Sequence, residues 1–85
     1  MEIGEVVFSK AGRDSGRFFI VTEVVDDTFV LIADGGLRKL SKPKKKKIKH
    51  LTSTGEIIET MKKKLISGTK VFDKELGSAL RAYNN

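Results

Sequence analysis

The sequence predicts a mainly β fold, a small barrel over residues 1–51 that is followed by a helical appendage over residues 52–85. Short apolar segments separated by glycine-containing turns fill the first part, and helical spacing of apolar residues replaces them in the second. Several short strands joined by tight turns are typical of a barrel rather than an open sheet. A length of 85 residues leaves room for one compact domain.

Three strands are expected in the first third of the chain, at residues 6–8, 17–26 and 28–33. The loop over residues 11–16 has a glycine near each end, which allows a tight reversal because glycine adopts positive φ at no steric cost. Both faces of the second strand are largely apolar, so we expect that a second layer partly covers the sheet.

The turn Asp34-Gly35-Gly36 predicts a second hairpin, since Asp-Gly suits turns that need positive φ. Pro43 interrupts the segment that follows, because proline donates no hydrogen bond to a sheet. We expect the lysine run over residues 44–47 to be a solvated, exposed loop, as blocks of like charge usually are. A last strand is predicted at residues 48–51.

The appendage is predicted to begin with a capping box over residues 53–56 and to continue as an amphipathic helix that ends at Gly68. Asp73 can cap a second short helix. The first helix is expected to pack on the barrel through residues such as Met61 and Leu65. The alternatives are that it docks a protein partner or presents residues 62–64 as a second basic patch.

The positive charge is local. The chain has 17 Lys and Arg against 11 Asp and Glu, and the segment 38–49 holds eight of these basic groups and no acidic one. A compact basic stripe attracts polyanions such as nucleic acid or an anionic membrane surface.

Several function classes are improbable from composition. There is no cysteine and only one histidine, so disulfides, thiolate metal sites and a cysteine nucleophile are excluded, and no metal cluster or nucleophile–base pair is evident. We therefore expect no cofactor, no metal and no enzymatic activity. The acidic N-terminus does not resemble a signal peptide, and no apolar run approaches the ~20 residues that cross a bilayer, which favours a cytoplasmic protein.

Residues 4–17, with their continuation through residue 25, resemble a KOW motif, in which two short strands flank a glycine-bearing loop. Residues 31–40 and 42–51 narrow the resemblance, which is to small stand-alone bacterial KOW proteins related to a large-subunit ribosomal protein of the L-fourteen-e type. It covers about residues 3–51. The resemblance implies an SH3-like β-barrel that binds RNA, often structured ribosomal RNA, and it brings no catalytic residues.

The candidate RNA-binding residues come from two segments. By position, Gly12 occupies the characteristic glycine of the KOW loop, and Lys10, Arg13 and Arg17 are its cationic members. The basic stripe is expected to contact phosphates, because lysines act as point charges that read the backbone and not the bases. Its members are Arg38, Lys39, Lys42, Lys44, Lys45, Lys46, Lys47 and Lys49.

Each of these cations also has an ordinary structural interpretation. Arg13 could pair with Asp14, and Arg17 could pair with an acid on a neighbouring strand. Among the aromatic residues, Phe8, Phe18 and Phe29 are expected in the core, whereas Phe19 has the opposite parity to Phe18 and could be exposed to stack on a base.

We predict an RNA-binding module that docks on structured RNA, most plausibly ribosomal, and recognises mainly its shape. The alternative is a protein-interaction adaptor of the translation or transcription machinery. The chain has no Trp and one Tyr, which argues against a groove for proline-rich peptides. Attachment to anionic lipid is a third possibility, although a large apolar anchor beside the lysines is missing.

Overall fold

The computed structural model describes all residues from 1 to 85. Five strands precede three helices, with one 3₁₀ helix between the last two strands. In chain order the elements are β1 (Glu5–Ser9), β2 (Phe18–Val24), β3 (Phe29–Ala33), β4 (Lys44–Lys47), the 3₁₀ helix (Ile48–His50), β5 (Leu51–Ile57), α1 (Glu59–Ser67), α2 (Asp73–Ala79) and α3 (Arg81–Asn84). None of the helices is long and apolar enough to cross a membrane.

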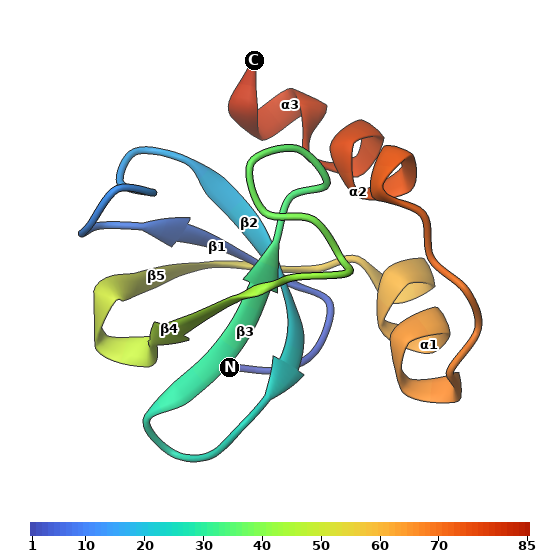
Figure 1. The fold of residues 1–85 in the computed structure, drawn as a ribbon, viewed down its shortest axis with the longest axis horizontal. Helices are drawn as coiled ribbons and strands as arrows, with labels where there is room; N and C mark the ends of the chain where they lie inside the picture. Colours follow the sequence, from blue (N-terminus) through green and yellow to red (C-terminus); the bar gives the residue numbers. More distant parts are fainter.

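The strands form one antiparallel sheet in the order β4-β3-β2-β1-β5 (Figure 1). The two edge strands, β4 and β5, are consecutive in the chain and are joined by the three-residue 3₁₀ helix. Such a short connection requires the sheet to curl until its edges approach each other. The predicted mainly β fold, a small SH3-like barrel with a C-terminal helical tail, is therefore confirmed.

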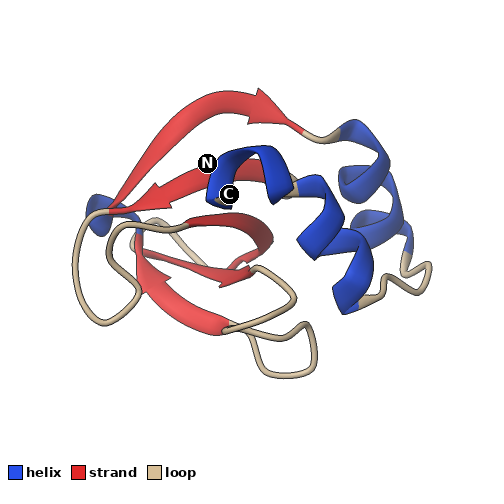
Figure 2. Cartoon of the chain, turned by 90° about the horizontal axis from the view of Figure 1, so that it is seen from above, coloured by secondary structure: helices blue, strands red, loops and turns tan.

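Both faces of the three central strands, β1, β2 and β3, carry buried residues, but the two faces pack against different partners. The inner core, which fills the barrel, consists of Val7, Phe19, Val21, Val30, Ile32 and Leu51. The outer core joins the opposite face of β1, β2 and β3 to the helical tail, and it consists of Val6, Ile20, Ala33, Met61, Leu76 and Leu80. Figure 2 shows the helices gathered against one side of the curved sheet. The expected second layer is thus the tail itself, which explains why β2 is apolar on both faces.

Phe19 belongs to the inner core and is fully buried, so the prediction that it could be exposed for base stacking is wrong. Its neighbour Phe18 is only half-buried and packs against Phe8 and Tyr83 beside the outer core. Parity along an apolar strand separates the two faces but does not indicate which face lies inside the barrel.

The lysine run is a strand and not the expected loop. Lys44–Lys47 forms β4, whose residues pair in antiparallel register with β3, so that Lys46 lies opposite Val30 and Lys47 opposite Phe29. Pairing with β3 supplies backbone hydrogen bonds, and these offset the repulsion between the neighbouring lysines. Lysine side chains on an edge strand also discourage pairing with another chain.

The predicted capping box at residues 53–56 is wrong, because these residues lie within β5. Pairing of β5 with β1 overrides the local helix signal, and the Thr54 hydroxyl donates to the backbone oxygen of Val6 at 2.8 Å. The boundary between residues 51 and 52 consequently falls inside β5. The first helix begins only at Glu59, and its predicted end at Gly68 is confirmed by a left-handed φ of 76°.

The helical tail contacts the barrel through the outer core, and it also contacts the loop after β3 and the start of β2. The predicted second helix is observed as α2, but Asp73 does not cap it, because Phe72 holds the N-cap position. The Asp73 carboxylate instead accepts a hydrogen bond from the backbone N–H of Leu40 at 2.7 Å. At Gly35, a Cβ atom would overlap the backbone oxygen of Asp73, so only glycine fits this contact. The side chain of Asn84 in α3 accepts from the Phe18 N–H and donates to the Phe18 carbonyl.

Candidate nucleic-acid interface

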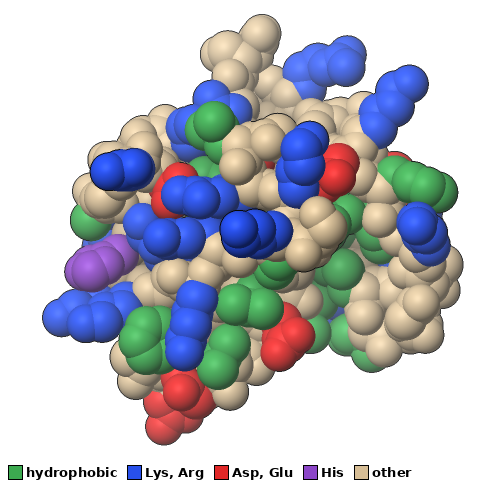
Figure 3. Space-filling model, viewed as in Figure 1, with side chains coloured by type: hydrophobic (Ala, Val, Ile, Leu, Met, Phe, Trp, Pro, Cys, Tyr) green, Lys and Arg blue, Asp and Glu red, His purple; other side chains and the backbone are tan.

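Basic side chains gather on one face of the molecule, over β4 and the loop that precedes it (Figure 3). Lys44, Lys45 and Lys47 are exposed on β4, while Lys46 is buried. Residues 36–39 and 41–45 line an open groove of about 580 Å³, whose charged members are Arg38, Lys39, Lys42, Lys44 and Lys45. The groove contains no acidic side chain, so its electrostatic potential favours an anion.

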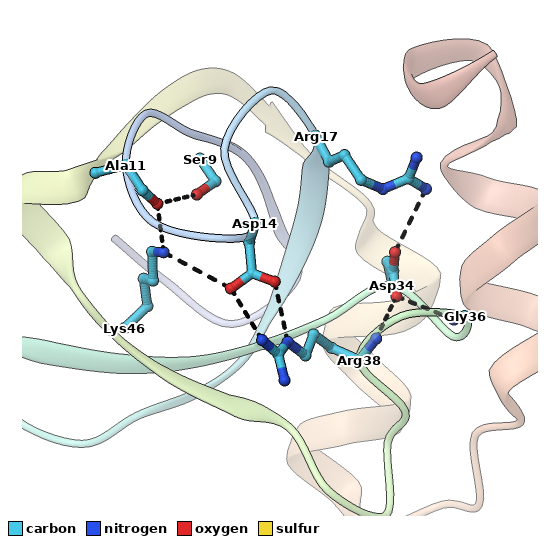
Figure 4. Close-up of polar contacts among 8 residues, drawn as sticks. All are labelled: Ser9, Ala11, Asp14, Arg17, Asp34, Gly36, Arg38 and Lys46. Atoms are coloured by element: carbon cyan, nitrogen blue, oxygen red, sulfur yellow. Dashed lines mark hydrogen bonds and ion pairs between the residues drawn. The ribbon is translucent and has the colours of Figure 1, made fainter.

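The buried Asp14 lies beneath this basic face and pairs with two of its cations. Its carboxylate is 4% exposed and lies 3.0 Å from Arg38 Nε and 3.7 Å from Lys46 Nζ (Figure 4). The Lys46 side chain is itself 8% exposed, and its Nζ also donates to the backbone oxygen of Ala11 at 2.7 Å. One buried acid thus connects three segments: the loop between β1 and β2, the loop after β3, and strand β4.

The conformation of the loop between β1 and β2 requires glycine at position 12. This residue has a φ of +81°, and a Cβ atom there would approach Lys46 Nζ to 3.1 Å. A side chain would therefore be strained by its backbone and would press on the buried ammonium group. The glycine lets the exposed loop lie close to β4.

A second buried acid, Asp34, shapes the loop after β3. Its Oδ1 accepts hydrogen bonds from the backbone N–H groups of Gly36 at 3.0 Å and Arg38 at 2.8 Å. Arg17 approaches its other oxygen at 3.5 Å, which agrees with the expected pairing of Arg17 with an acid on a neighbouring strand. The Arg17 Nε is buried and has no hydrogen-bond partner.

The outer side of β4 carries a cation–π contact. Lys45 Nζ lies 4.6 Å from the centroid of the Phe29 ring, and Phe29 is half-buried. Near it, hydrogen bonds from the backbone N–H groups of Thr28 and Phe29, with a smaller contribution from the charge of Lys45, lower the pKa of Asp26. Lys45 therefore contacts the Phe29 ring and helps to lower the pKa of Asp26 while its own side chain stays exposed.

The structure sorts the predicted site residues by exposure. Arg17 and Arg38 are half-buried and paired with the aspartates, and Lys46 is buried. The exposed members are Lys10, Gly12, Arg13, Lys39, Lys42, Lys44, Lys45, Lys47 and Lys49. Arg13 does not pair with Asp14, whose ion-pair partners are Arg38 and Lys46. Sequence reasoning missed Asp14, although an acid between the two glycines of a basic loop was a usable signal.

Two of the three consecutive lysines on α1 are engaged with acids. Lys62 lies 2.6 Å from Glu2, and this pairing raises the pKa of Lys62. Lys64 lies 2.7 Å from Glu75, and its hydrogen bond lowers the pKa of Glu75. Only Lys63 is left without an acidic partner, so α1 is a weaker anion surface than β4.

The chain is similar in sequence to two proteins of known identity. No family model matches the chain. The chain is 39% identical to the large ribosomal subunit protein eL14 of Desulfurococcus amylolyticus in an alignment of 61 residues. It is 31% identical to the eL14 protein of Staphylothermus marinus in an alignment of the same length, and each alignment covers 69% of the chain. Each match covers 62% of the relative, so the chain spans less than two thirds of their length. The chain is thus related in sequence to eL14 ribosomal proteins, as the L-fourteen-e resemblance predicted.

Proposed function

We propose that this protein is a non-enzymatic RNA-binding module of the KOW type that docks on structured RNA, in the first place ribosomal RNA. The single observation that carries the proposal is the acid-free groove beside β4, whose exposed lysines have no acidic partner. Similarity to eL14 ribosomal proteins from two organisms supports RNA of the large subunit as the partner. A cytoplasmic site of action and kinship with small bacterial KOW proteins remain part of this proposal.

The mechanism is electrostatic docking on the RNA backbone. Lys39, Lys42, Lys44, Lys45 and Lys47 contact phosphates, with Lys49 at the end of the row and Lys10, Gly12 and Arg13 forming a second contact from the loop. Lysine carries no base information, so recognition is mainly of shape. The set of phosphate-contacting cations is smaller than the sequence predicted. Lys46 and Arg38 hold Asp14 instead, and Arg17 pairs with Asp34.

The test is the salt dependence of binding to purified large-subunit ribosomal RNA. If about five phosphates are neutralised, log K falls with log salt at a slope of roughly −3.5 to −4.5. Replacing Lys44 and Lys47 by Gln removes about two contacts and makes the slope shallower by roughly 1.4 to 1.8. The matched control is the double change Lys63→Gln and Lys70→Gln on the tail, which leaves the slope unaltered.

Edge protection is the competing explanation for these lysines, and a charge reversal separates the two. Glutamate also protects a strand edge, so Lys44→Glu with Lys47→Glu keeps the protein monodisperse under edge protection. Under RNA docking the same variant repels phosphate and loses more affinity than the Gln variant. RNA affinity equal to that of the unaltered protein would refute the proposal. Partners that survive RNase in a pull-down would favour the adaptor alternative.

A further inference from the structure

A second groove lies between the barrel and the helical tail. It has a volume of about 460 Å³ and is bounded by Arg17, by the glycine turn after β3, and by α2 and α3. Its lining includes Gly36, which also lines the groove beside β4. The loop after β3 therefore contributes to both grooves, and Figure 1 shows this loop next to α2 and α3.

The charged groups of this second groove are three cations and two acids. The cations are Arg17, Lys74 and Arg81, and neither Lys74 nor Arg81 has an acidic side chain within 4.0 Å. Both acids are engaged with the fold, because Asp34 accepts from two backbone N–H groups and Asp73 accepts from Leu40. In contrast, Lys74 and Arg81 form no ion pair, and Arg17 forms only one.

Arg17 is the strongest indication that the groove is built for a ligand. Its only ionic contact is the 3.5 Å approach to Asp34, and its buried Nε has no partner in the protein. A guanidinium group presents five N–H donors. The Nε donor has almost no exposed surface, so the four donors on the terminal nitrogens of the partly exposed side chain are those that an anion in the groove would reach.

Gly77 supplies an independent observation. It lies in the interior of α2 and on the groove lining, where glycine weakens a helix relative to alanine. A Cβ atom at this position would meet nothing within 4 Å, so packing within the protein does not require glycine. The absent side chain instead leaves the floor of the groove open to close approach by a ligand.

We propose that this groove binds a phosphate group, held by Arg17 and Arg81 with Lys74 nearby. Guanidinium groups bind phosphate oxygens in pairs of parallel hydrogen bonds. The phosphate belongs to the same RNA that occupies the groove beside β4, since the two grooves meet at Gly36. This inference rests on the proposed function and extends its contact surface onto the helical tail.

The experiment compares variants of the two grooves in binding to large-subunit ribosomal RNA. Arg81→Gln is expected to make the slope of log K against log salt shallower by roughly 0.7 to 0.9, the contribution of one phosphate. Gly77→Gln fills the floor of the groove and is expected to weaken binding at least tenfold, whereas Gly77→Ala raises the melting temperature and still weakens binding. Lys63→Gln, which removes the same charge from α1, is the matched control with no change.

A titration with pyrophosphate, followed through the backbone amide NMR signals of Gly36, Gly77 and Ser78, distinguishes the source of the phosphate. Shifts of these signals by RNA and by pyrophosphate support the full proposal. Shifts by pyrophosphate alone, with RNA affinity insensitive to Arg81→Gln, support a phosphate site but overturn its assignment to RNA. If neither probe shifts the signals, the site does not exist.

The two proposals can fail separately. If Lys44→Gln with Lys47→Gln weakens RNA binding while the Arg81 and Gly77 variants do not, the groove proposal is wrong and the proposed function stands. If no variant of either groove changes RNA affinity, both proposals are wrong. A melting temperature measured for every variant identifies any loss of binding that results from unfolding.

Discussion

Lys46 and its two neighbours on β4 have the same side chain and opposite surroundings. Lys46 points to the inner side of the sheet, is buried, and is held by Asp14 and the Ala11 carbonyl. Lys45 and Lys47 point to the other side and are exposed. The comparison teaches that a run of identical charges can hold a structural residue and binding residues together. Strand alternation separates Lys46 from its two neighbours, whereas Lys44, which has the same parity as Lys46, is exposed because it lies at the start of the strand.

The largest expected effect concerns the acid beneath this strand. Asp14→Asn removes the negative charge between Lys46 and Arg38, and the buried ammonium group is then left without compensation. We expect the free energy of unfolding in urea to fall by about 2–4 kcal/mol. Asp27→Asn, at an exposed turn position, is the control and should stay within about 0.5 kcal/mol.

A smaller loss is expected for Lys46→Met. Methionine fills a similar volume but removes the 2.7 Å hydrogen bond to the Ala11 carbonyl, which keeps only the Ser9 hydroxyl at 3.2 Å, while Asp14 keeps Arg38 as a partner. The free energy of unfolding should fall by about 1–2 kcal/mol. An unfolding midpoint equal to that of Lys47→Met would show that the two sides of β4 do not differ.

The smallest effect concerns the outer side of the strand. Lys45→Gln removes a charge that helps to lower the pKa of Asp26, so this pKa should rise slightly while remaining below 3.8, because the two backbone hydrogen bonds are the larger cause. A lowered pKa means that Asp26 stabilises the fold above pH ~3.8 and that this contribution is lost as the pH falls through the folded value. Carboxyl NMR titration measures the shift, and an unchanged Asp26 pKa would mean that Lys45 does not act on this turn.

The sequence predicted the fold where local signals and tertiary pairing agree. Apolar runs and an Asp-Gly turn indicated the first three strands, and the apolar second face of β2 indicated a covering layer. Gly68 was expected to end a helix because it can adopt positive φ, and it does. These features depend on neighbours that lie close together in sequence.

The rest depended on partners that are distant in sequence. Four consecutive lysines show no apolar alternation, so β4 is specified by β3 and by Asp14, which precedes it by some thirty residues. The segment after Leu51 matches a helix cap locally, yet pairing with β1 makes it a strand. For the candidate site, the location of the basic residues was predictable, but the burial of Lys46 and the approach of Arg17 to the tail were not.

One measurement tests the central claim most directly: the salt dependence of ribosomal RNA binding for Lys46→Gln and Lys47→Gln, at temperatures where both variants are folded. We predict that Lys47→Gln makes the slope shallower by roughly 0.7 to 0.9 and that Lys46→Gln leaves it as in the unaltered protein. Equal changes in slope for the two variants, or a change for Lys46→Gln alone, would contradict the division of β4 into a structural lysine and binding lysines.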